Sequence, residues 1–514
     1  MKIAIRTDAS IDIGIGHVMR CLSLADSLKE KGAKVVFICR EHKGNTIELI
    51  QNKGYVVHKL PRLKISDPGH NILKNKGSME HMRWLGATQD EDAILCKEVL
   101  LRKDKLDWMI VDHYAIDETW QLQLKNTYNK LMVIDDLGNR KHICDILLDQ
   151  TFGRKKTDYE ALVPKHCNLL LGSQYALLRS DFIKWRKYSL RRRVNPQFRK
   201  LLITMGGVDS NNITGQVLDI IKNCKLPKHL EIVVIMGAEA PHIESVNKQA
   251  KMMPNKTLVR TNVANMAEIM ADADLAIGAA GTTTWERCCL GVPSIQMVLA
   301  NNQIEVAKKL NSVGASYYLE HIDWLCESID NLSRKMQKTI IITSSISDGR
   351  GVDKVLSCMG QDCSSIPNLL LKPVALSDCN FVYTLQTEGI RKYFNNPVVP
   401  TSNEHIKWFE KTIKAKEIQL FILILDSQKA GVLRLNKLDD RVYEISIIIS
   451  PNYTCQGVAK NALKMLEDIL LNRTLKAVIH KDNTASIKVF YQAGFRIREK
   501  GKNGVFINYY KNII

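Results

Sequence analysis

Short apolar segments alternate with longer amphipathic segments from the start of the chain. Four of the apolar segments are expected to be buried strands, at residues 2–5, 34–39, 108–112 and 131–136. Their apolar character on both faces is typical of a parallel sheet that helices cover on both sides. Residues 17–31 repeat apolar positions with helical spacing, and Gly32 follows them as a natural helix stop. This alternation predicts a doubly wound α/β body.

The same alternation begins again after a basic stretch at residues 188–199 (YSLRRRVNPQFR), which is expected to be loop-like. The Arg191–Arg193 run in this stretch is interpreted as a solvated hinge or helix face rather than a phosphate site. Further strands are expected at residues 201–205, 231–236 and 275–278. The sequence therefore predicts two Rossmann-like halves in tandem, at residues 1–190 and 191–360.

The pattern changes after Gly360. Residues 361–368 (QDCSSIPN) are polar, contain a proline and are interpreted as a linker. Beyond them, strands are expected at residues 421–425, 431–435, 443–449 and 476–480, and helices at 457–471 and 484–493. This α+β pattern with antiparallel content predicts a separate domain of ordinary size over residues 369–514.

Composition is that of an ordinary globular protein. Hydrophobic residues make up 45% and charged residues 25% of the 514 residues, which excludes a disordered or fibrous chain. The net charge of +19 favours anionic partners, but the lysines are spread along the whole length, so nucleic-acid binding is not expected. The thirteen cysteines include no CxxC pair, so neither a disulfide framework nor a zinc cluster is expected. The sequence shows neither a signal-peptide pattern nor an apolar run of about 18 residues. We therefore expect a cytoplasmic protein without membrane contact.

A glycine turn that ends in a histidine follows the first expected strand. Gly14-Ile15-Gly16-His17 opens the first helix, where glycines allow close approach to a ligand and helix amides favour an anion. Ligands of such sheets bind outside the carboxyl ends of the strands. His17 is therefore placed to deprotonate water or an acceptor hydroxyl. On spacing alone, a packing turn with a backbone-satisfied histidine is an equal interpretation.

A second glycine turn precedes a later helix. Amides and hydroxyls of Gly281-Thr282-Thr283-Thr284 can hold a pyrophosphate without a metal, and Glu286 lies one turn into the helix. The alternative is a threonine-capped helix with an ordinary first-turn glutamate. Gly206-Gly207 offers another loop of close approach. Asp272 and Asp274 form the DxD of metal-dependent glycosyltransferases, but they precede a strand as turn residues, so no metal is expected.

Several stretches occur in the order found in a known enzyme family. They are RTDASIDIGIGHVMRCLSLADSL from Arg6, IVDHY from Ile110, VIDD from Val133, LLG from Leu170, YALLR from Tyr175, MGGVD from Met205 and GAAGTTTWERCCLGVPS from Gly278. Over nearly all of residues 1–355 the chain resembles the UDP-sugar hydrolases of pseudaminic acid biosynthesis, of the GT-B glycosyltransferase superfamily. That family cleaves UDP from UDP-2,4-diacetamido-2,4,6-trideoxy-β-L-altropyranose.

This resemblance implies roles for individual residues. It implies that His17 is the base that activates water and that UDP binds in residues 191–360. The sugar side would be lined by Arg6, Asp8, Gly16 and Tyr114. The UDP side would be formed by Gly206, Gly207, Gly281, Thr282, Thr283 and Glu286, with Glu286 at the ribose hydroxyls. Asn302 and Gln303 resemble the polar pair of the superfamily that faces the sugar–diphosphate junction.

The C-terminal region carries a third group of motifs. They are EISIIISP from Glu444, YTCQGVAKNAL from Tyr453, NTAS from Asn483 and FYQAGF from Phe490. They resemble the GNAT N-acetyltransferases, in which a (Gln/Arg)xxGx(Gly/Ala) loop holds the CoA pyrophosphate with backbone amides. In this chain Thr454 departs from the first position of that loop. The remaining loop positions are Gln456, Gly457, Val458 and Ala459.

The GNAT resemblance implies acetyl-CoA as a co-substrate. It implies Asn483 as a CoA contact, Tyr491 as the acid that protonates the leaving thiolate, and Glu444 or Glu404 as the base. A plain core aromatic is the alternative interpretation of Tyr491. The stretches LKP from Leu371, RKYF from Arg391 and EHIKW from Glu404 resemble nucleotide-sugar amine acetyltransferases of the same pathway.

Those acetyltransferases modify the C4 amine and make the substrate of the hydrolase. Two consecutive steps on one chain are therefore expected, with a UDP-sugar, water and acetyl-CoA as reactants. The alternatives are a GT-B glycosyltransferase with a UDP-sugar donor, a non-catalytic nucleotide or nucleic-acid binder, and a hydrolase with a degenerate GNAT domain.

Overall fold

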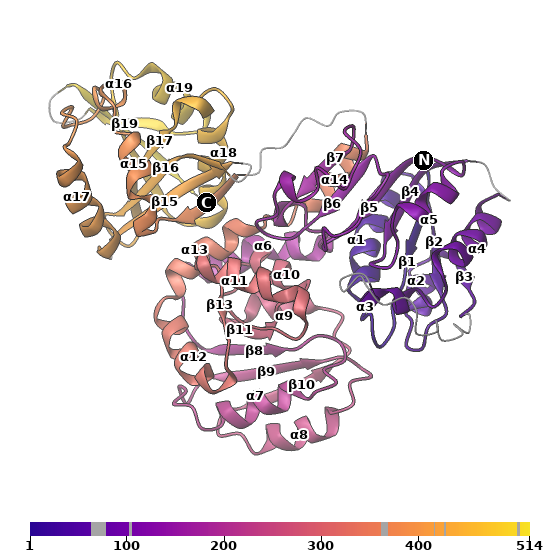
Figure 1. Cartoon of the computed structure of the whole chain (residues 1–514). Helices are drawn as coiled ribbons and strands as arrows, with labels where there is room; N and C mark the ends of the chain where they lie inside the picture. Colours follow the sequence, from indigo (N-terminus) through magenta and orange to yellow (C-terminus); the bar gives the residue numbers. More distant parts are fainter. Residues whose placement is uncertain are drawn as a thin grey trace.

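The computed structural model describes residues 1–62, 79–101, 105–360, 369–415, 417–425, 428–500 and 504–513, and these form three β-sheets. Figure 1 shows the first sheet in indigo and purple, the second in magenta and pink, and the third in orange and yellow. We call the sheets with their helices the first body, the second body and the C-terminal body. The expected linker at residues 361–368 lies outside the described residues.

The first body is a parallel sheet with the order β3-β2-β1-β4-β5-β6-β7. Successive residues of β1 point to opposite faces, with Ile3 and Ile5 in one apolar cluster and Ala4 in another. Helices cover both faces, as the doubly apolar strands predict. The strands are β1 (Lys2–Thr7), β2 (Lys34–Arg40), β3 (Val56–Leu60), β4 (Leu106–Asp112), β5 (Tyr128–Ile134), β6 (Ile146–Asp149) and β7 (Asn168–Leu171). The helices include α1 (Gly16–Glu30), α2 (Ile47–Asn52), α3 (Met79–Met82), α4 (Gln89–Leu101) and α5 (Glu118–Leu124).

The second body repeats this architecture with the parallel order β10-β9-β8-β11-β12-β13. Its strands are β8 (Lys200–Thr204), β9 (Glu231–Met236), β10 (Thr257–Thr261), β11 (Leu275–Ala279), β12 (Ser294–Met297) and β13 (Tyr317–Tyr318). Its helices include α6 (Ser180–Arg192), α7 (Ile213–Ile221), α8 (Ile243–Lys251), α9 (Met266–Asp272), α10 (Thr283–Cys289), α11 (Ile304–Ser312), α12 (Leu325–Arg334) and α13 (Met336–Ile346). The two Rossmann-like bodies confirm the predicted GT-B class of fold.

The basic stretch at residues 188–199 differs from the expectation, because α6 extends through it to Arg192. Arg193 is buried rather than solvated, and its guanidinium donates to the carbonyl oxygens of Ser189 and Ala271, each at 2.9 Å. Arg192 forms an ion pair with Asp274 at 2.5 Å. The charges are satisfied by carbonyls and a carboxylate of neighbouring turns, so this stretch fixes α6 on the second body.

The helix α14 (Gly351–Met359) returns to the first body, although the sequence division at residue 191 places it with the second. Its residues Val352, Val355 and Leu356 join the apolar cluster beneath α1. Only a glycine fits at Gly351, because an added Cβ would lie 2.2 Å from the carbonyl oxygen of Ala176. In Figure 1 this orange helix lies among the purple elements beside β6 and β7.

The C-terminal body is a mixed sheet with the order β14-β15-β16-β17-β18-β20-β19. All neighbouring pairs are antiparallel except β17 and β18, which run parallel. The strands are β14 (Leu369–Pro373), β15 (Ile418–Leu425), β16 (Gln428–Lys437), β17 (Val442–Ile449), β18 (Thr474–His480), β19 (Arg496–Lys500) and β20 (Phe506–Asn512). The helices include α15 (Cys379–Thr384), α16 (Glu388–Arg391), α17 (Ser402–Lys414), α18 (Val458–Ile469) and α19 (Thr484–Gln492). This confirms the predicted α+β class.

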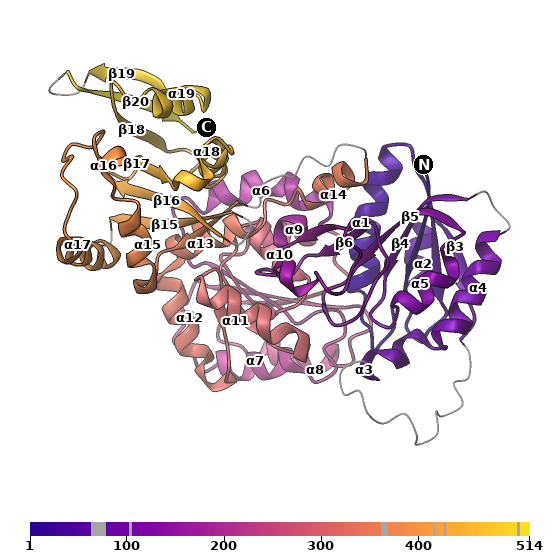
Figure 2. The same cartoon turned by 45° about the horizontal axis from the view of Figure 1, so that its top comes forward.

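The C-terminal body packs directly on the second body. Elements β14 and α18 contact α13, and α18 also contacts α6, as Figure 2 shows from above. Ile341 and Ile342 of α13 share one apolar cluster with Leu371 and Leu463 of the C-terminal body. Arg473 donates to the carbonyl oxygen of Val194 at 3.0 Å. Apolar and polar contacts therefore both hold this interface.

Two further features concern cysteines and helix length. Cys224 and Cys326 form a disulfide across 102 residues of sequence, a pairing that the sequence did not suggest. Among the described residues, no helix is both long and apolar enough to span a bilayer.

Candidate active sites

His17 lies in the first turn of α1 and is held by a carboxylate from a neighbouring strand. Its Nδ1 lies 2.6 Å from Oδ1 of Asp112, the last residue of β4. Because β4 lies beside β1 in the sheet, its carboxyl end reaches the start of α1. When Nδ1 donates its proton to Asp112, Nε2 carries the free lone pair and can accept a proton. The imidazole is 8% exposed.

Arg20 holds the Asp112 carboxylate in position. Its Nε and Nη2 donate to the two oxygens of Asp112, both at 2.6 Å, and its Nη1 donates to Asp136 at 2.5 Å. Burial alone would raise the pKa of Asp112, but the charges of Arg20 and His17 hold this pKa well below its usual value. The sequence alone did not predict that Asp112, Arg20 and Asp136 form this network beside His17. The sequence did contain a signal for these two carboxylates, because Asp112 and Asp136 are each the last residue of an expected strand.

An aromatic wall adjoins His17. The Tyr114 ring meets the imidazole edge to face with 4.5 Å between centroids, and its hydroxyl donates to Asp136 at 3.1 Å. Trp84 stacks on Tyr114 at 5.7 Å, and His81 packs against both rings. Tyr114 therefore lies beside the predicted base, whereas Trp84 and His81 belong to no motif that the sequence displayed.

Arg6 and Asp8 lie beneath this surface rather than on it. Both side chains are fully buried, and Arg6 donates to Asp8 at 2.6 Å and to Asp92 at 2.7 Å. Asp8 also accepts from the backbone N–H of Arg40 at 2.7 Å. The resemblance places both residues on the sugar side, but Arg6 is held by Asp8 and by Asp92 of α4, and Asp8 Oδ2 lies 3.4 Å from His113 Nε2. They hold the carboxyl ends of β1 and β2 together.

The glycine turns of the first and second bodies face each other. A Cβ added to Gly16 would lie 3.6 Å from the Thr282 side chain, and one added to Gly207 would lie 3.8 Å from Ile15. The structure therefore brings Gly16 and His17 opposite the loops that contain Gly206-Gly207 and Gly281-Thr282.

Glu286 lies half-buried on α10 near these loops. Burial raises the pKa of its carboxyl group to about 7, although the charges of Arg179 and Arg287 oppose the shift. Its carboxylate has no hydrogen bond or ion pair with any residue that the structure describes. Thr283 Oγ1 receives a hydrogen bond from Arg287 at 3.3 Å.

The other predicted polar positions of the second body are more dispersed. Gln303 Nε2 lies 3.8 Å from the Cβ position of Gly281, and its Oε1 accepts from Leu299 at 2.9 Å. Asn302 is exposed. Asp272 accepts from the Tyr188 hydroxyl at 2.7 Å, and Asp274 binds Arg192 and two backbone amides. Both carboxylates of the DxD therefore have structural partners.

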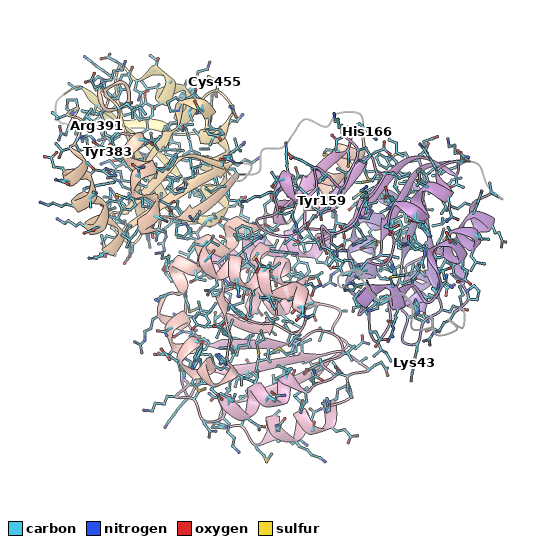
Figure 3. The ribbon with its side chains drawn as sticks, viewed as in Figure 1. Lys43, Tyr159, His166, Tyr383, Arg391 and Cys455 are labelled. Carbon is cyan, nitrogen blue, oxygen red and sulfur yellow. A yellow bond between two sulfur atoms is a disulfide. The ribbon has the colours of Figure 1, made fainter. Side chains whose placement is uncertain are left out.

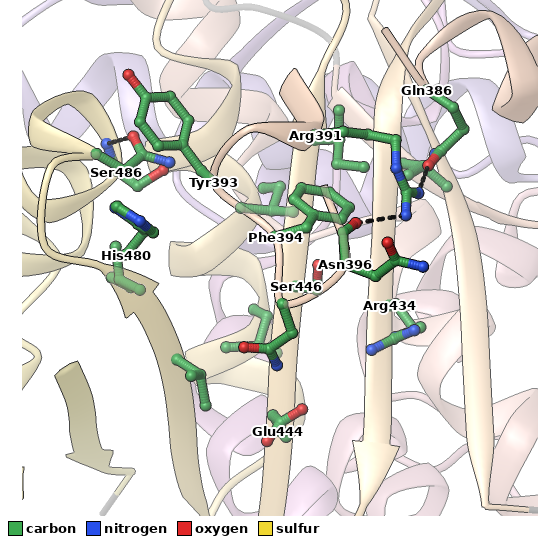
Figure 4. A pocket seen from close by; sticks show the side chains of 18 of the residues that line it. Gln386, Arg391, Tyr393, Phe394, Asn396, Arg434, Glu444, Ser446, His480 and Ser486 are labelled. Atoms are coloured by element: carbon green, nitrogen blue, oxygen red, sulfur yellow. Dashed lines mark hydrogen bonds between the residues drawn. The ribbon is translucent and has the colours of Figure 1, made fainter. Parts of the chain in front are cut away.

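A cavity of about 620 Å³ opens in the C-terminal body. It lies where β17 and β18 diverge, since the two strands pair only from Val442–Thr474 to Glu444–Lys476. Its walls come from β16, β17, β18, the start of α19 and the segment around α16, as Figure 4 shows. Charged and polar lining residues include Gln386, Arg391, Asn395, Asn396, Glu404, His405, Arg434, Glu444, Ser446, His480, Asn483 and Ser486.

Tyr491 lies outside this cavity. Its side chain is 56% exposed and lies under the guanidinium of Arg496, with 4.4 Å to the ring centroid. Phe490, one position earlier, is 4% exposed and lines the cavity. One residue rotates a helix position by about 100°. Tyr491 is thus not among the residues that line the cavity, and the acid role that the resemblance implies for it stays a prediction.

The two predicted bases differ in their partners. Glu404 accepts from the backbone N–H and the hydroxyl of Thr401, both at 2.8 Å, and these bonds lower the pKa of Glu404. It is therefore committed to the cap of α17. Glu444 lines the cavity and forms neither a hydrogen bond nor an ion pair within the described part of the chain. Asn483 lines it too, and its Oδ1 caps α19 at Ser486 N, 3.1 Å away.

The predicted CoA loop lies at the start of α18. Gly457 precedes the helix with φ of 75°, which suits a glycine, and the small Ala459 follows. The first amides of α18 are thus open to a pyrophosphate, so the loop fits CoA despite Thr454. Gln456 is exposed and donates to the carbonyl oxygen of Asn452 at 2.9 Å. Figure 3 labels Cys455 of this loop and Arg391 of the cavity on opposite sides of the C-terminal body.

Comparison with known proteins supports this division. Residues 200–342 match the glycosyltransferase family 28 C-terminal domain, and residues 368–496 match the acetyltransferase (GNAT) domain. An uncharacterized protein of Methanocaldococcus jannaschii is 24% identical over 99% of both chains. The UDP-2,4-diacetamido-2,4,6-trideoxy-β-L-altropyranose hydrolase of Campylobacter jejuni is 27% identical over 61% of this chain and 97% of its own. The spermidine N(1)-acetyltransferase of Escherichia coli is 28% identical over 29% of this chain and 85% of its own.

These matches and the three sheets agree on one architecture. The chain is a fusion of a GT-B body, similar to the UDP-diacetamido-trideoxy-altropyranose hydrolases of pseudaminic acid biosynthesis, with a C-terminal GNAT acetyltransferase domain.

Proposed function

We propose that the GT-B body hydrolyses UDP-2,4-diacetamido-2,4,6-trideoxy-β-L-altropyranose and that the GNAT domain acetylates its 4-amino precursor with acetyl-CoA. The observation that carries the hydrolase proposal is the His17–Asp112 pair, which faces the glycine loops of the second body. We assign residues 1–190 to the sugar half, 191–360 to the UDP half except for α14, and 369–514 to the GNAT domain.

UDP is proposed to lie against the second body. Backbone amides of Gly206-Gly207 and Gly281-Thr282-Thr283 would hold the diphosphate, because glycines permit close approach. Glu286 would accept hydrogen bonds from both ribose hydroxyls, a role that fits its lack of a described partner. Asn302 and Gln303 would contact the sugar–diphosphate junction.

The sugar would then lie toward the first body, between Gly16 and the wall formed by Tyr114. A water oxygen attacks C1 of the sugar while Nε2 of His17 takes a proton from that water. The bond from C1 to the β-phosphate oxygen breaks, and its electron pair leaves with UDP. Asp112 stabilises the imidazolium that forms, and Arg20 keeps Asp112 in place. Arg6 and Asp8 support this site from below.

In the GNAT domain, acetyl-CoA supplies the activated acetyl group. Gln456, Gly457, Val458 and Ala459 are proposed to bind its pyrophosphate, and Asn483 to contact its pantetheine arm. Glu444 would take a proton from the acceptor ammonium, since Glu404 is committed to a helix cap. The neutral amine then attacks the thioester carbonyl, the C–S bond breaks, and the leaving CoA thiolate takes a proton from solvent rather than from Tyr491.

The test is to incubate the full chain with the UDP-diacetamido sugar in H₂¹⁸O without any acceptor. We expect UDP and a free sugar that carries ¹⁸O at C1. Both products are identified by NMR and mass spectrometry. A second incubation with the 4-amino UDP-sugar should give N-acetylated product only when acetyl-CoA is present. Release of UDP only in the presence of a sugar acceptor would instead identify a glycosyltransferase. Hydrolysis without any acetylation would identify a degenerate GNAT domain.

A further inference from the structure

Arg434 lines the GNAT cavity and has no hydrogen-bond or ion-pair partner among the described residues. It lies on β16, opposite Leu420 of β15 and Ser446 of β17, and it lines the cavity. Its Nε is buried without a hydrogen bond, and the described residues provide its guanidinium with no hydrogen bond or ion pair. Arg391 in the same cavity differs, because it donates to Gln386 at 2.7 Å and to Asn396 at 2.6 Å. Figure 4 shows these two bonds as dashed lines and none at Arg434.

Strand alternation places Arg434 on the face of the sheet that α18 does not cover. Val432, two residues before Arg434, packs with Val382 of α15 and Phe409 of α17. The adjacent Leu433 belongs instead to the cluster that contains Leu463 of α18. Because α18 begins at the CoA loop, the guanidinium lies on the opposite side of the sheet from the pyrophosphate site. It therefore faces the acceptor side of the cavity.

The carboxylates that line the cavity form no ion pair with Arg434 in the described structure. Glu404 is engaged by Thr401, and Glu444 is not within ion-pairing distance of Arg434. A half-buried guanidinium loses hydration, and this cost is recovered only when an anion or other acceptor binds it. A planar guanidinium is also well matched to the oxygens of a phosphate.

We propose that Arg434 binds the diphosphate of a nucleoside diphosphate acceptor and thereby selects anionic acceptors over polyamines. The proposal rests on the acetyltransferase function proposed above and adds the residue that determines its substrate class. A polycation such as spermidine would meet an uncompensated positive charge at this position. The resemblance of the domain to a spermidine acetyltransferase therefore does not extend to its acceptor.

The kinetic test compares Arg434→Gln with Arg434→Lys and with Arg441→Gln, a surface variant of the same charge change. We expect the KM for the 4-amino UDP-sugar to rise about 10- to 100-fold in Arg434→Gln, the scale of a hydrogen bond to a charged group. The KM for acetyl-CoA should stay within about twofold. Arg434→Lys should recover part of the loss and Arg441→Gln should show none. A rise in the KM for acetyl-CoA instead would overturn the assignment.

A second measurement does not depend on acetyl transfer. Hydrogen exchange is measured on the full chain with UDP as the probe. We expect UDP to slow exchange in residues 428–449 of the wild type and not of Arg434→Gln. UDP should slow exchange in residues 281–290 of the second body in the wild type and in Arg434→Gln, so these residues serve as the internal reference. Absence of protection at residues 428–449 in the wild type would refute the role of Arg434.

The two proposals fail in different ways. If the wild type acetylates the amine of another nucleoside diphosphate but not that of the 4-amino UDP-sugar, the proposed function is wrong and the role of Arg434 stands. If spermidine is the preferred acceptor, the role of Arg434 is wrong.

Discussion

The hydrolase site and the GNAT cavity differ in whether their charged residues already have partners within the protein. Asp112 accepts hydrogen bonds from His17, Arg20 and Cys21 before any ligand binds. Arg434 of the GNAT cavity has no such partner in the described structure. The base of the hydrolase site is held in position beforehand, because reorganisation during the reaction raises the barrier. A group that selects a ligand leaves its bonding capacity for that ligand. The contrast separates a positioned base from a cation that is left to bind a ligand.

The largest effect is expected from His17→Ala. Loss of the proposed general base should reduce hydrolytic turnover about 10²- to 10⁴-fold, while UDP affinity should change little because the proposed UDP site lies on the second body. Turnover is followed by UDP release and affinity by calorimetry. His166→Ala, an exposed histidine of the same body, serves as the control. Loss of UDP affinity with normal turnover of bound substrate would make His17 a binding residue.

Asp112→Asn tests whether the internal bonds matter to catalysis. We expect turnover to fall about 100-fold, the upper scale of a hydrogen bond to a charged group. UDP affinity should stay near that of the wild type, whereas a purely structural role would lower turnover and UDP affinity together. Circular dichroism and UDP binding confirm that the variant is folded, since Arg20 loses a buried partner.

Glu286→Ala should weaken UDP binding by about 1.5–3 kcal/mol, as expected for hydrogen bonds to a charged group. Glu286→Gln separates charge from shape. Because burial raises the pKa of Glu286 to about 7, wild-type affinity for a non-hydrolysable UDP-sugar analogue should increase between pH 6 and pH 8. The phosphates of such an analogue are diesters and do not titrate there. Affinity of the Gln variant should stay flat, and an equal slope in both proteins would contradict this role.

The same shift has a consequence for stability. A carboxyl group whose pKa is raised in the folded state holds its proton longer than in the unfolded chain, so the free energy of unfolding falls as pH rises toward 7. Glu286→Gln has no titrating carboxyl group at this position, so its free energy of unfolding does not fall in this way. Its melting temperature should therefore exceed that of the wild type at pH 8 by more than at pH 5.

The smallest effect is expected from Tyr491→Phe. The hydroxyl lies outside the cavity, so acetyl transfer should stay within about twofold of the wild type. Phe490→Ala should instead lower the rate and the stability, because Phe490 is buried and lines the cavity. A loss of more than tenfold in Tyr491→Phe would restore the acid role that the motif suggested.

The sequence predicts most of the fold because the deciding signals are local. Strands such as β9 and β11 are short and almost wholly apolar, and their ends agree with the expectation within one residue. The turn at Gly14 and the start of α1 are marked by glycines and helical spacing. The position of His17 beside a second strand follows from the rule that parallel strands present their carboxyl ends at one edge.

The remaining parts depend on contacts between distant segments. Asp112 is 95 residues from His17, and no local pattern shows which carboxylate will meet the imidazole. Whether Phe490 or Tyr491 lines the cavity is, by contrast, a local question within α19. Ile487 and Asn483 lie three and seven residues before Phe490, on the same helix face. Helical phase therefore favours Phe490, whereas motif position favoured the tyrosine. The buried state of Arg193 and the return of α14 require the assembled bodies.

The return of α14 gives the chain two crossings between the halves of the GT-B body. One crossing follows the first body into α6, and the other lies between Ile346 and Gly351. Two crossings restrict any opening of the cleft to a hinge through both of them. The GNAT domain packs on α13 and α6, next to this axis. A hinge motion would thus move the GNAT domain very little. The cleft of the GT-B body would open and close without displacing the entrance of the GNAT cavity.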